Sequence, residues 1–252
     1  MIDTHCHLDF PVFDGDREAV WARARDVGVR GLVIPGVRLD SFGRILALRG
    51  EGCRIAFGLH PVFWGEHPED ALAQLEGWVR WHAPVAVGEI GLDYMVSSES
   101  FEVQARLFEG QLRLAKAFHL PVLLHVRRAH EPVLALLRQV KFPCGGIVHA
   151  FSGSLEQARA YIRLGFCVGI GGVVTRGQAT RVRQVAARVD AASLVLESDA
   201  PDLPPLGRIG ERNEPACLGE VVATLAALRG VEVADLILAT TRNARRVLNW
   251  QE

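Results

Sequence analysis

Side chains that could bind metal ions follow several separate apolar runs of this sequence. His5 and His7 form an H-x-H pair near the N-terminus, and the other candidates are Glu89, His125, His149 and Asp199. Because side chains alternate across a strand, both histidines of the pair should point to the same side and hold one cation. An isolated H-x-H pair is equally typical of hydrogen-bonded core histidines, so the metal interpretation depends on all six residues meeting at one place.

The donor set indicates which ions such a site would take. Four imidazoles and two carboxylates suit zinc, manganese, cobalt or nickel better than magnesium, which favours oxygen ligands. The set is also too large for one tetrahedral ion. We therefore expect two divalent metal ions bridged by Glu89. A modified lysine often bridges the ions of barrel hydrolases, but neither lysine of the chain ends a predicted strand. The first ion would take His5, His7 and Asp199, and the second would take His125 and His149.

Two adjacent cations would support hydrolysis. Such a pair activates a water molecule near neutral pH and stabilises the entering and leaving oxygens of an in-line displacement. We predict that Asp199 orients this water and accepts its proton, and that Glu89 is the second catalytic carboxylate. Glu197 lies two residues before Asp199 on the same strand face. It would either support a ligand histidine from outside the coordination sphere or form a structural salt bridge.

Three further residues are predicted to contact a substrate, namely Arg127, His60 and Asn213. Arg127 follows His125 by two residues and His60 ends the run RIAFGLHP, so both should lie at the same rim and bind a phosphate oxygen. The alternative for each is simple exposure to solvent. His130 and Arg212 are weaker candidates of the same kind, whereas His67, His82 and His119 fall in or beside helices and are interpreted as structural.

The elements that must position these groups alternate along the chain. Short apolar runs, typical of buried parallel strands, occupy residues 1–7, 29–35, 54–60, 84–90, 120–126, 145–149, 166–172 and 193–199. Longer amphipathic segments between and after them predict helices over 14–27, 41–49, 69–82, 101–118, 131–138, 155–164, 176–189, 216–228, 233–238 and 241–248. The pattern repeats a strand followed by a helix.

This alternation predicts an α/β fold, a closed TIM (β/α)8 barrel formed by one domain over residues 1–252. The main rival is an open doubly wound sheet, which is disfavoured because no G-x-G-x-x-G follows the first strand. In a TIM barrel the active site assembles at the C-terminal ends of the strands, where the candidate ligands fall. So many ionisable groups at one mouth would leave costly unpaired charge without a cation.

The composition excludes some classes of protein. With 49% hydrophobic and 23% charged residues the chain should fold as a soluble domain, and its net charge of -1 gives no overall attraction for a polyanion. Five separated cysteines without a C-x-x-C pair indicate neither a disulfide framework nor a thiolate zinc site. Without a signal peptide or a membrane-length apolar run, we expect a cytoplasmic protein that contacts no membrane and needs no obligate protein partner.

A series of motifs runs along the whole chain. They are IDTHCHLD at 2–9, GLHP at 58–61, VGEIGLDY at 87–94, the F-x-x-Q patterns from Phe101 to Gln104 and from Phe108 to Gln111, LLHVRRAHE at 123–131, VHAFSGS at 148–154, ESDAPDLPP at 197–205 and NEPA at 213–216. Taken in order, these motifs resemble those of the TatD family of metal-dependent hydrolases from end to end. The resemblance implies a TIM barrel and a binuclear metal site at the six positions. It also implies deoxyribonuclease activity, including exonuclease action on DNA, as in several family members.

Three functions are compatible with these observations. The leading hypothesis is a two-metal deoxyribonuclease acting on DNA ends or on short single-stranded DNA. The second is a small-molecule hydrolase of esters, lactones or amides, because the same activated water attacks a carbonyl group and a fold does not determine a function. The third is a metal-binding protein that catalyses little, which the complete ligand set disfavours.

Overall fold

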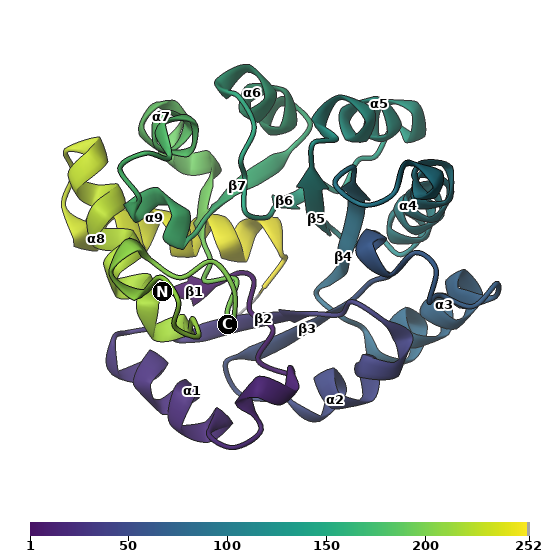
Figure 1. Cartoon of the computed structure of the whole chain (residues 1–252), viewed down its shortest axis with the longest axis horizontal. Coiled ribbons are helices and arrows are strands. Elements are labelled where there is room, and N and C mark those ends of the chain that lie inside the picture. The colour runs from purple at the N-terminus through teal and green to yellow at the C-terminus, as the bar shows by residue number, and fades with distance from the viewer. Residues whose placement is uncertain (251–252) are drawn as a thin grey trace.

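The structure is a computed structural model that describes residues 1–250, and its strands form one parallel sheet curled into a barrel (Figure 1). Eight strands follow one another around the sheet in chain order. They are β1 Ile2–Asp3, β2 Gly31–Pro35, β3 Cys53–Phe57, β4 Ala86–Asp93, β5 Val122–Arg127, β6 Gly146–Val148, β7 Phe166–Ile170 and β8 Leu194–Leu196. Most strand residues are buried, as expected when helices cover the sheet and its inner face packs on itself.

Hydrogen bonds just beyond the paired residues join the last strand to the first. The backbone N–H and the hydroxyl of Thr4 both donate to the carbonyl of Leu196, at 3.0 and 3.1 Å. Asp199 N then donates to the carbonyl of His5 at 2.9 Å. The closure of the barrel therefore brings two predicted ligands, about 190 residues apart in the chain, into direct contact.

Helices cover the barrel, the first eight around its outside in chain order and the last across one end (Figure 1). They are α1 Arg17–Asp26, α2 Phe42–Ala47, α3 Ala71–His82, α4 Phe101–Ala117, α5 His130–Val140, α6 Leu155–Arg163, α7 Thr180–Arg188, α8 Leu218–Arg229 and α9 Val233–Val247. Local signals explain some boundaries: Ser154 and Gln157 form a capping box before α6, and Gly230 ends α8 with a φ of 65°. None of the helices within residues 1–250 is long and apolar enough to cross a membrane. The predicted TIM-barrel architecture is confirmed.

Helix α9 differs from the prediction and closes the floor of the barrel. The expected break between 238 and 241 is wrong, because the hydroxyl of Thr240 donates to the carbonyl of Leu236 at 2.8 Å and is satisfied within a continuous helix. Ala244, Val247 and Leu248 form one stripe of this segment. The stripe packs on apolar residues from all eight strands: Ile2, Val33, Ala56, Ala86, Leu123, Ile147, Cys167 and Val195.

The alternation of side chains then explains why the opposite end of the barrel is polar. Two positions after Leu123 stands His125, and two positions after Ile147 stands His149. Glu197 follows Val195 in the same way. Since residues two apart share a face of a strand, an apolar floor is followed by a layer of ionisable groups.

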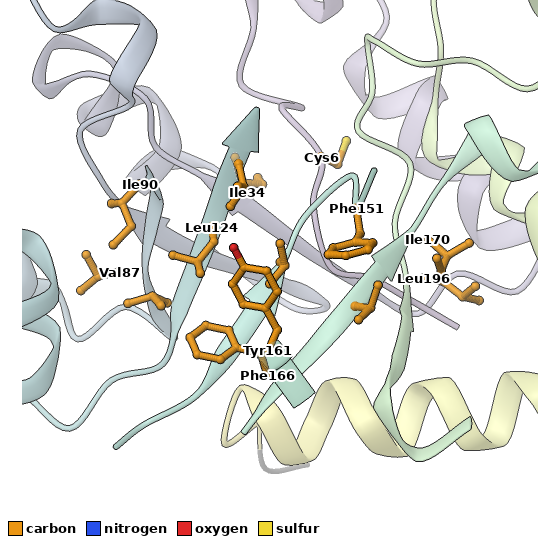
Figure 2. Close-up of a cluster of buried hydrophobic side chains, with 14 of the residues drawn as sticks. Cys6, Ile34, Val87, Ile90, Leu124, Phe151, Tyr161, Phe166, Ile170 and Leu196 are labelled. Carbon is orange, nitrogen blue, oxygen red and sulfur yellow. The ribbon is translucent and has the colours of Figure 1, made fainter. Parts of the chain in front are cut away.

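The larger apolar core lies between the sheet and the helices. Figure 2 shows part of it, with Leu124 from β5, Phe166 from β7 and Tyr161 from α6. Tyr161 is fully buried, and its hydroxyl lies 3.4 Å from the carbonyl of His130 at the start of α5. The hydroxyl keeps a polar partner while the ring fills the space between the sheet and its covering helices.

Several strands end earlier than predicted, and this difference places ligands on irregular chain. Regular pairing in β1, β6 and β8 ends at Asp3, Val148 and Leu196. His5, His7, His149 and Asp199 therefore lie beyond the ladder, whereas Glu89 and His125 lie within strands. Asp199 has a φ of 58°, so the backbone turns in the left-handed region at the residue that carries the carboxylate.

Candidate metal centre

Glu89 lies at the centre of the polar cluster at the barrel mouth. Its side chain is 2% exposed, and its Oε2 lies 3.2 Å from Nε2 of His5 and 3.5 Å from Nε2 of His7. Its Oε1 lies 3.0 Å from Nδ1 of His125 and 3.5 Å from Nε2 of His149. The two oxygens thus face two different pairs of histidines. A carboxylate in this position is suited to bridging two cations.

Asp199 completes the first group of potential ligands. The Nε2 atoms of His5 and His7 are 3.3 Å apart, and Oδ1 of Asp199 lies 3.9 Å from Nε2 of His5. One ligand atom from each of the three residues lies within 4.8 Å of the others. These distances are compatible with a single cation between them. Asp199 Oδ1 also lies 3.8 Å from Nε2 of His149, so the two groups are contiguous.

Asp93 orients His125, and the sequence analysis did not single it out. Nε2 of His125 lies 3.0 Å from Oδ2 of Asp93, which accepts the proton on that nitrogen. In the neutral imidazole Nδ1, which lies 3.0 Å from Oε1 of Glu89, is then the nitrogen left to bind a cation. A carboxylate on the far nitrogen is the usual support for a metal-binding histidine. Its position in the sequence could have pointed to this role, since Asp93 ends the strand that carries Glu89.

His60 also reaches Glu89, but the opposite nitrogen carries its proton. Its Nδ1 accepts a hydrogen bond from Val62 N at 3.1 Å, so the proton of the neutral imidazole must be on Nε2. That Nε2 lies 3.3 Å from Oε1 of Glu89. Although His60, Glu89 and His125 are close enough to form a third group of potential ligands, a protonated nitrogen cannot bind a cation. We therefore interpret His60 as a hydrogen-bond donor.

Glu197 lies beside His149 on the side away from Glu89. Oε1 of Glu197 is 3.4 Å from Nδ1 of His149, within ion-pair distance, and accepts a hydrogen bond from Ala150 N at 2.5 Å. A Cβ at position 169 would lie 2.2 Å from Oε2 of Glu197, so Gly169 leaves the room that this carboxylate occupies. Within residues 1–250 Glu197 pairs with no arginine or lysine. This favours support of His149 over a structural salt bridge.

Asp3 is a second buried carboxylate that sequence reasoning missed. Its Oδ1 accepts hydrogen bonds from His5 N at 3.2 Å and from Ser198 N at 2.9 Å. Burial raises its pKa to about 7. Asp3 therefore ties together the two chain segments that carry His5 and Asp199. Its place in the motif IDTHCHLD was the only signal in the sequence.

The charges of the cluster depend on one another. Burial raises the pKa of Asp199 to about 6, although His149 and His7 oppose the shift. Burial alone would lower the pKa of His149, but the carboxylates of Asp199, Glu89 and Glu197 outweigh it and raise that pKa to about 10. Burial also opposes ionisation of Glu89, yet the surrounding histidines hold its pKa well below the usual range. Without metal, the cluster therefore retains protons at neutral pH.

The residues present fit divalent cations. Within the described chain none of these carboxylates and imidazoles pairs with an arginine or a lysine, and the Nδ1 atoms of His5 and His7 have no hydrogen-bond partner. Gathering ionisable groups in a buried site is costly unless their charge is compensated. Imidazole and carboxylate donors at these separations would be compensated by bound divalent metal ions.

We predict that cation affinity falls as the pH falls. A cation must displace the proton held by His149, whose pKa is raised to about 10, and below about pH 6 it must also displace one from Asp199. Each displaced proton weakens the apparent affinity about tenfold per pH unit. Titration calorimetry with Zn²⁺ in buffers of different ionisation enthalpy would measure the protons released. Binding without proton release would contradict the charges assigned here.

A cavity of about 480 Å³ opens beside the cluster and is lined in part by His125, His149 and Asp199. Arg127, which ends β5, lines the same cavity and is exposed, so it lies at the rim as predicted. The remaining wall is largely apolar and includes Val126, Phe151, Val173, Val182 and Leu203. The cavity therefore combines a guanidinium with apolar surface next to the predicted ligands.

The side-chain amide of Asn213 is occupied by hydrogen bonds within the protein. It is 1% exposed, and its Nδ2 donates to the carbonyls of Ser198 and Asp202, both at 2.7 Å. These bonds hold the loop that carries Asp199. Arg212 is similarly engaged, with a 2.7 Å ion pair to Asp16. We interpret both side chains as structural, although Asn213 was expected to contact substrate.

A parallel barrel whose mouth gathers histidines and carboxylates in this way is that of a metal-dependent hydrolase. Comparison with known proteins agrees, because the model of the family described as TatD related DNase matches residues 2–249. The chain belongs to this TatD family of metal-dependent hydrolases.

Two relatives and one solved structure illustrate the similarity. The chain is 41% identical over 253 residues to the uncharacterized metal-dependent hydrolase YjjV of Escherichia coli K12, covering 99% of this chain and 98% of that protein. It is 34% identical over 257 residues to the 3'-5' ssDNA/RNA exonuclease TatD of Shigella flexneri, with 97% of each covered. The crystal structure of E. coli YjjV superposes with a TM-score of 0.96 at 40% identity, covering 100% of this chain and 98% of that one.

Proposed function

We propose that this protein is a two-metal phosphodiesterase that removes nucleotides from the ends of single-stranded DNA. The observation that carries the proposal is the position of Glu89, whose two oxygens face separate pairs of histidines beside a cavity. In this proposal Glu89 would be shared by two cations, of which His5, His7 and Asp199 would hold one and His125 and His149 would hold the other. When bound, the cations would lower the pKa of a water molecule and neutralise charge on a phosphate.

Four side chains of the protein would then have separate roles in the reaction. Asp199 orients the attacking water and accepts its proton, a role that suits a carboxyl whose pKa burial raises to about 6. Arg127 binds a phosphate oxygen from the cavity rim. His60, with its proton on Nε2, donates a hydrogen bond from the side of Glu89. Glu197 holds His149 in its orientation.

The size and charge of the site favour the end of a strand as substrate. A cavity of about 480 Å³ falls within the range of small-molecule pockets, which suits one terminal nucleotide better than a duplex. The net charge of -1 offers no general attraction for long polyanions, so recognition must be local. The 34% identical relative from S. flexneri is an exonuclease of this type.

The direct test uses metal-loaded protein and a single-stranded oligonucleotide carrying a label at one end or the other. We expect progressive release of mononucleotides from one end, loss of this activity on chelation and its recovery when metal is restored. Product sizes on a denaturing gel distinguish exonuclease from endonuclease action. An RNA strand of the same sequence tests whether the protein prefers DNA over RNA. Failure of fully loaded protein to cut any strand would contradict the proposal.

The apolar wall of the cavity favours a second candidate, a small-molecule hydrolase. Val173, Val182 and Leu203 could hold the apolar part of an ester, lactone or amide whose carbonyl is attacked by the same water. A panel of carbonyl esters with metal-loaded protein tests this candidate. Metal-dependent turnover of an ester combined with uncut oligonucleotides would favour it over the nuclease.

A further inference from the structure

Two buried glutamines on α4 have no role in the chemistry proposed above. Gln104 and Gln111 are each 1% exposed and stand seven residues apart, so they lie on the same face of the helix. They are the glutamines of the two F-x-x-Q patterns. Because a fully buried amide is costly unless its donor and acceptor are both used, their partners show what these side chains hold in place.

Each glutamine pairs with both backbone groups of a single residue. Asp93 N donates to Oε1 of Gln104 at 2.8 Å, and Nε2 of Gln104 donates back to the carbonyl of Asp93 at 3.0 Å. Leu59 N donates to Oε1 of Gln111 at 2.7 Å, and Nε2 of Gln111 donates to the carbonyl of Leu59 at 3.1 Å. Each amide thus satisfies both backbone groups of a residue that ends a strand or lies just beyond one.

The two clamped residues lead to different parts of the metal centre. Asp93 accepts the proton on Nε2 of His125 and thereby leaves Nδ1 toward Glu89. Leu59 precedes His60, which carries its proton on Nε2 and cannot be a ligand in that state. Gln104 is therefore connected to a predicted ligand, and Gln111 is connected to a hydrogen-bond donor.

We propose that Gln104 and Asp93 form a positioning chain from α4 that selects Nδ1 of His125 as a metal ligand. The inference rests on the proposed two-cation site. It means that Gln104 and Asp93 affect the cation that His125 and His149 would bind. Loss of a carboxylate that supports a ligand histidine typically lowers metal affinity about 10- to 100-fold. Neither Gln104 nor Asp93 contacts His5, His7 or Asp199, which would hold the first cation. The first cation should therefore bind normally.

Titration calorimetry of the metal-free protein with Mn²⁺ tests the proposal. Gln104→Met keeps the length of the side chain, and we expect it to weaken the second binding event about tenfold or more while leaving the first unchanged. Gln111→Met is a matched control, with the same residue type, helix, burial and double backbone clamp, although only Gln104 also donates to Oγ of Ser100, at 2.7 Å. It should leave both binding events unchanged, although both variants should lower the melting temperature.

The outcomes separate positioning from general loosening of the fold. Equal weakening by Gln104→Met and Gln111→Met, or no weakening by Gln104→Met, would overturn the positioning chain. If Gln104→Met does not fold, Asp93→Asn tests the same step, since the backbone clamp remains while the charge and one of the two oxygens that accept from Met95 N and from His125 are lost. In Asp93→Asn the second cation should bind more weakly while the first binds as in wild type, and unchanged binding of both would overturn the proposal. Wild-type protein that binds a single cation would instead overturn the two-metal site itself.

Discussion

Replacing Asp199 by asparagine should lower the rate of oligonucleotide hydrolysis by a factor of about 100 to 10,000, the usual contribution of a general base. Asparagine keeps the size of the side chain and can still accept a hydrogen bond, but it cannot take a proton from water. The expected loss is in kcat, measured by single-turnover release of nucleotides at saturating metal. Metal content should be measured on the same samples, because Asp199 is also a predicted ligand.

The matched control for this variant is Asp202→Asn. Asp202 lines the same cavity three residues away, and its backbone N–H donates to the carbonyl of Asp199, yet its carboxylate has no place in the predicted ligand set. Its substitution should change kcat little. Equal activity of Asp199→Asn and wild type, both fully loaded, would remove the proposed role of Asp199 as base.

Replacing Glu89 by glutamine should abolish tight binding of both cations. The substitution removes the charge from a side chain whose two oxygens lie within 3.5 Å of nitrogens on five imidazoles. Ligand that binds only the folded state stabilises it by about 2.7 kcal/mol at 100 times its Kd. We therefore expect Zn²⁺ to raise the melting temperature of wild type but not of Glu89→Gln.

Elemental analysis after gel filtration measures the same effect directly. Wild type should retain two metal ions per chain and Glu89→Gln close to none. Glu99→Gln is a suitable control, because Glu99 is exposed on the turn before α4 and belongs to none of the groups of potential ligands. Retention of both ions by Glu89→Gln would show that this carboxylate is not the bridge.

Much of the fold could be predicted because its signals are local. Buried strands such as Val122–Arg127 appear as apolar runs, and the helices between them appear as amphipathic segments. The break predicted near Thr240 was wrong because a hydroxyl that usually weakens a helix is satisfied here within its own turn. Strand ends were overestimated where ligands such as His149 continue the apolar pattern beyond the last paired residue.

The sequence by itself determined which types of ligand are available and toward which face most of them point. Alternation along a strand is a local property, so His125 two residues after Leu123 must share its face. The same rule placed Arg127 at the rim beside the cavity. These conclusions needed no knowledge of what lies across the barrel.

Only the tertiary structure decided which atoms meet. Asp93 holds His125, Val62 N determines the proton on His60, and Asn213 is used inside the protein. Each of these contacts depends on the angle and register between elements, or on the shape of an irregular loop, and neither follows from residue type. Closure of the barrel between β8 and β1, which brings Asp199 to His5, depends on all the strands packing together.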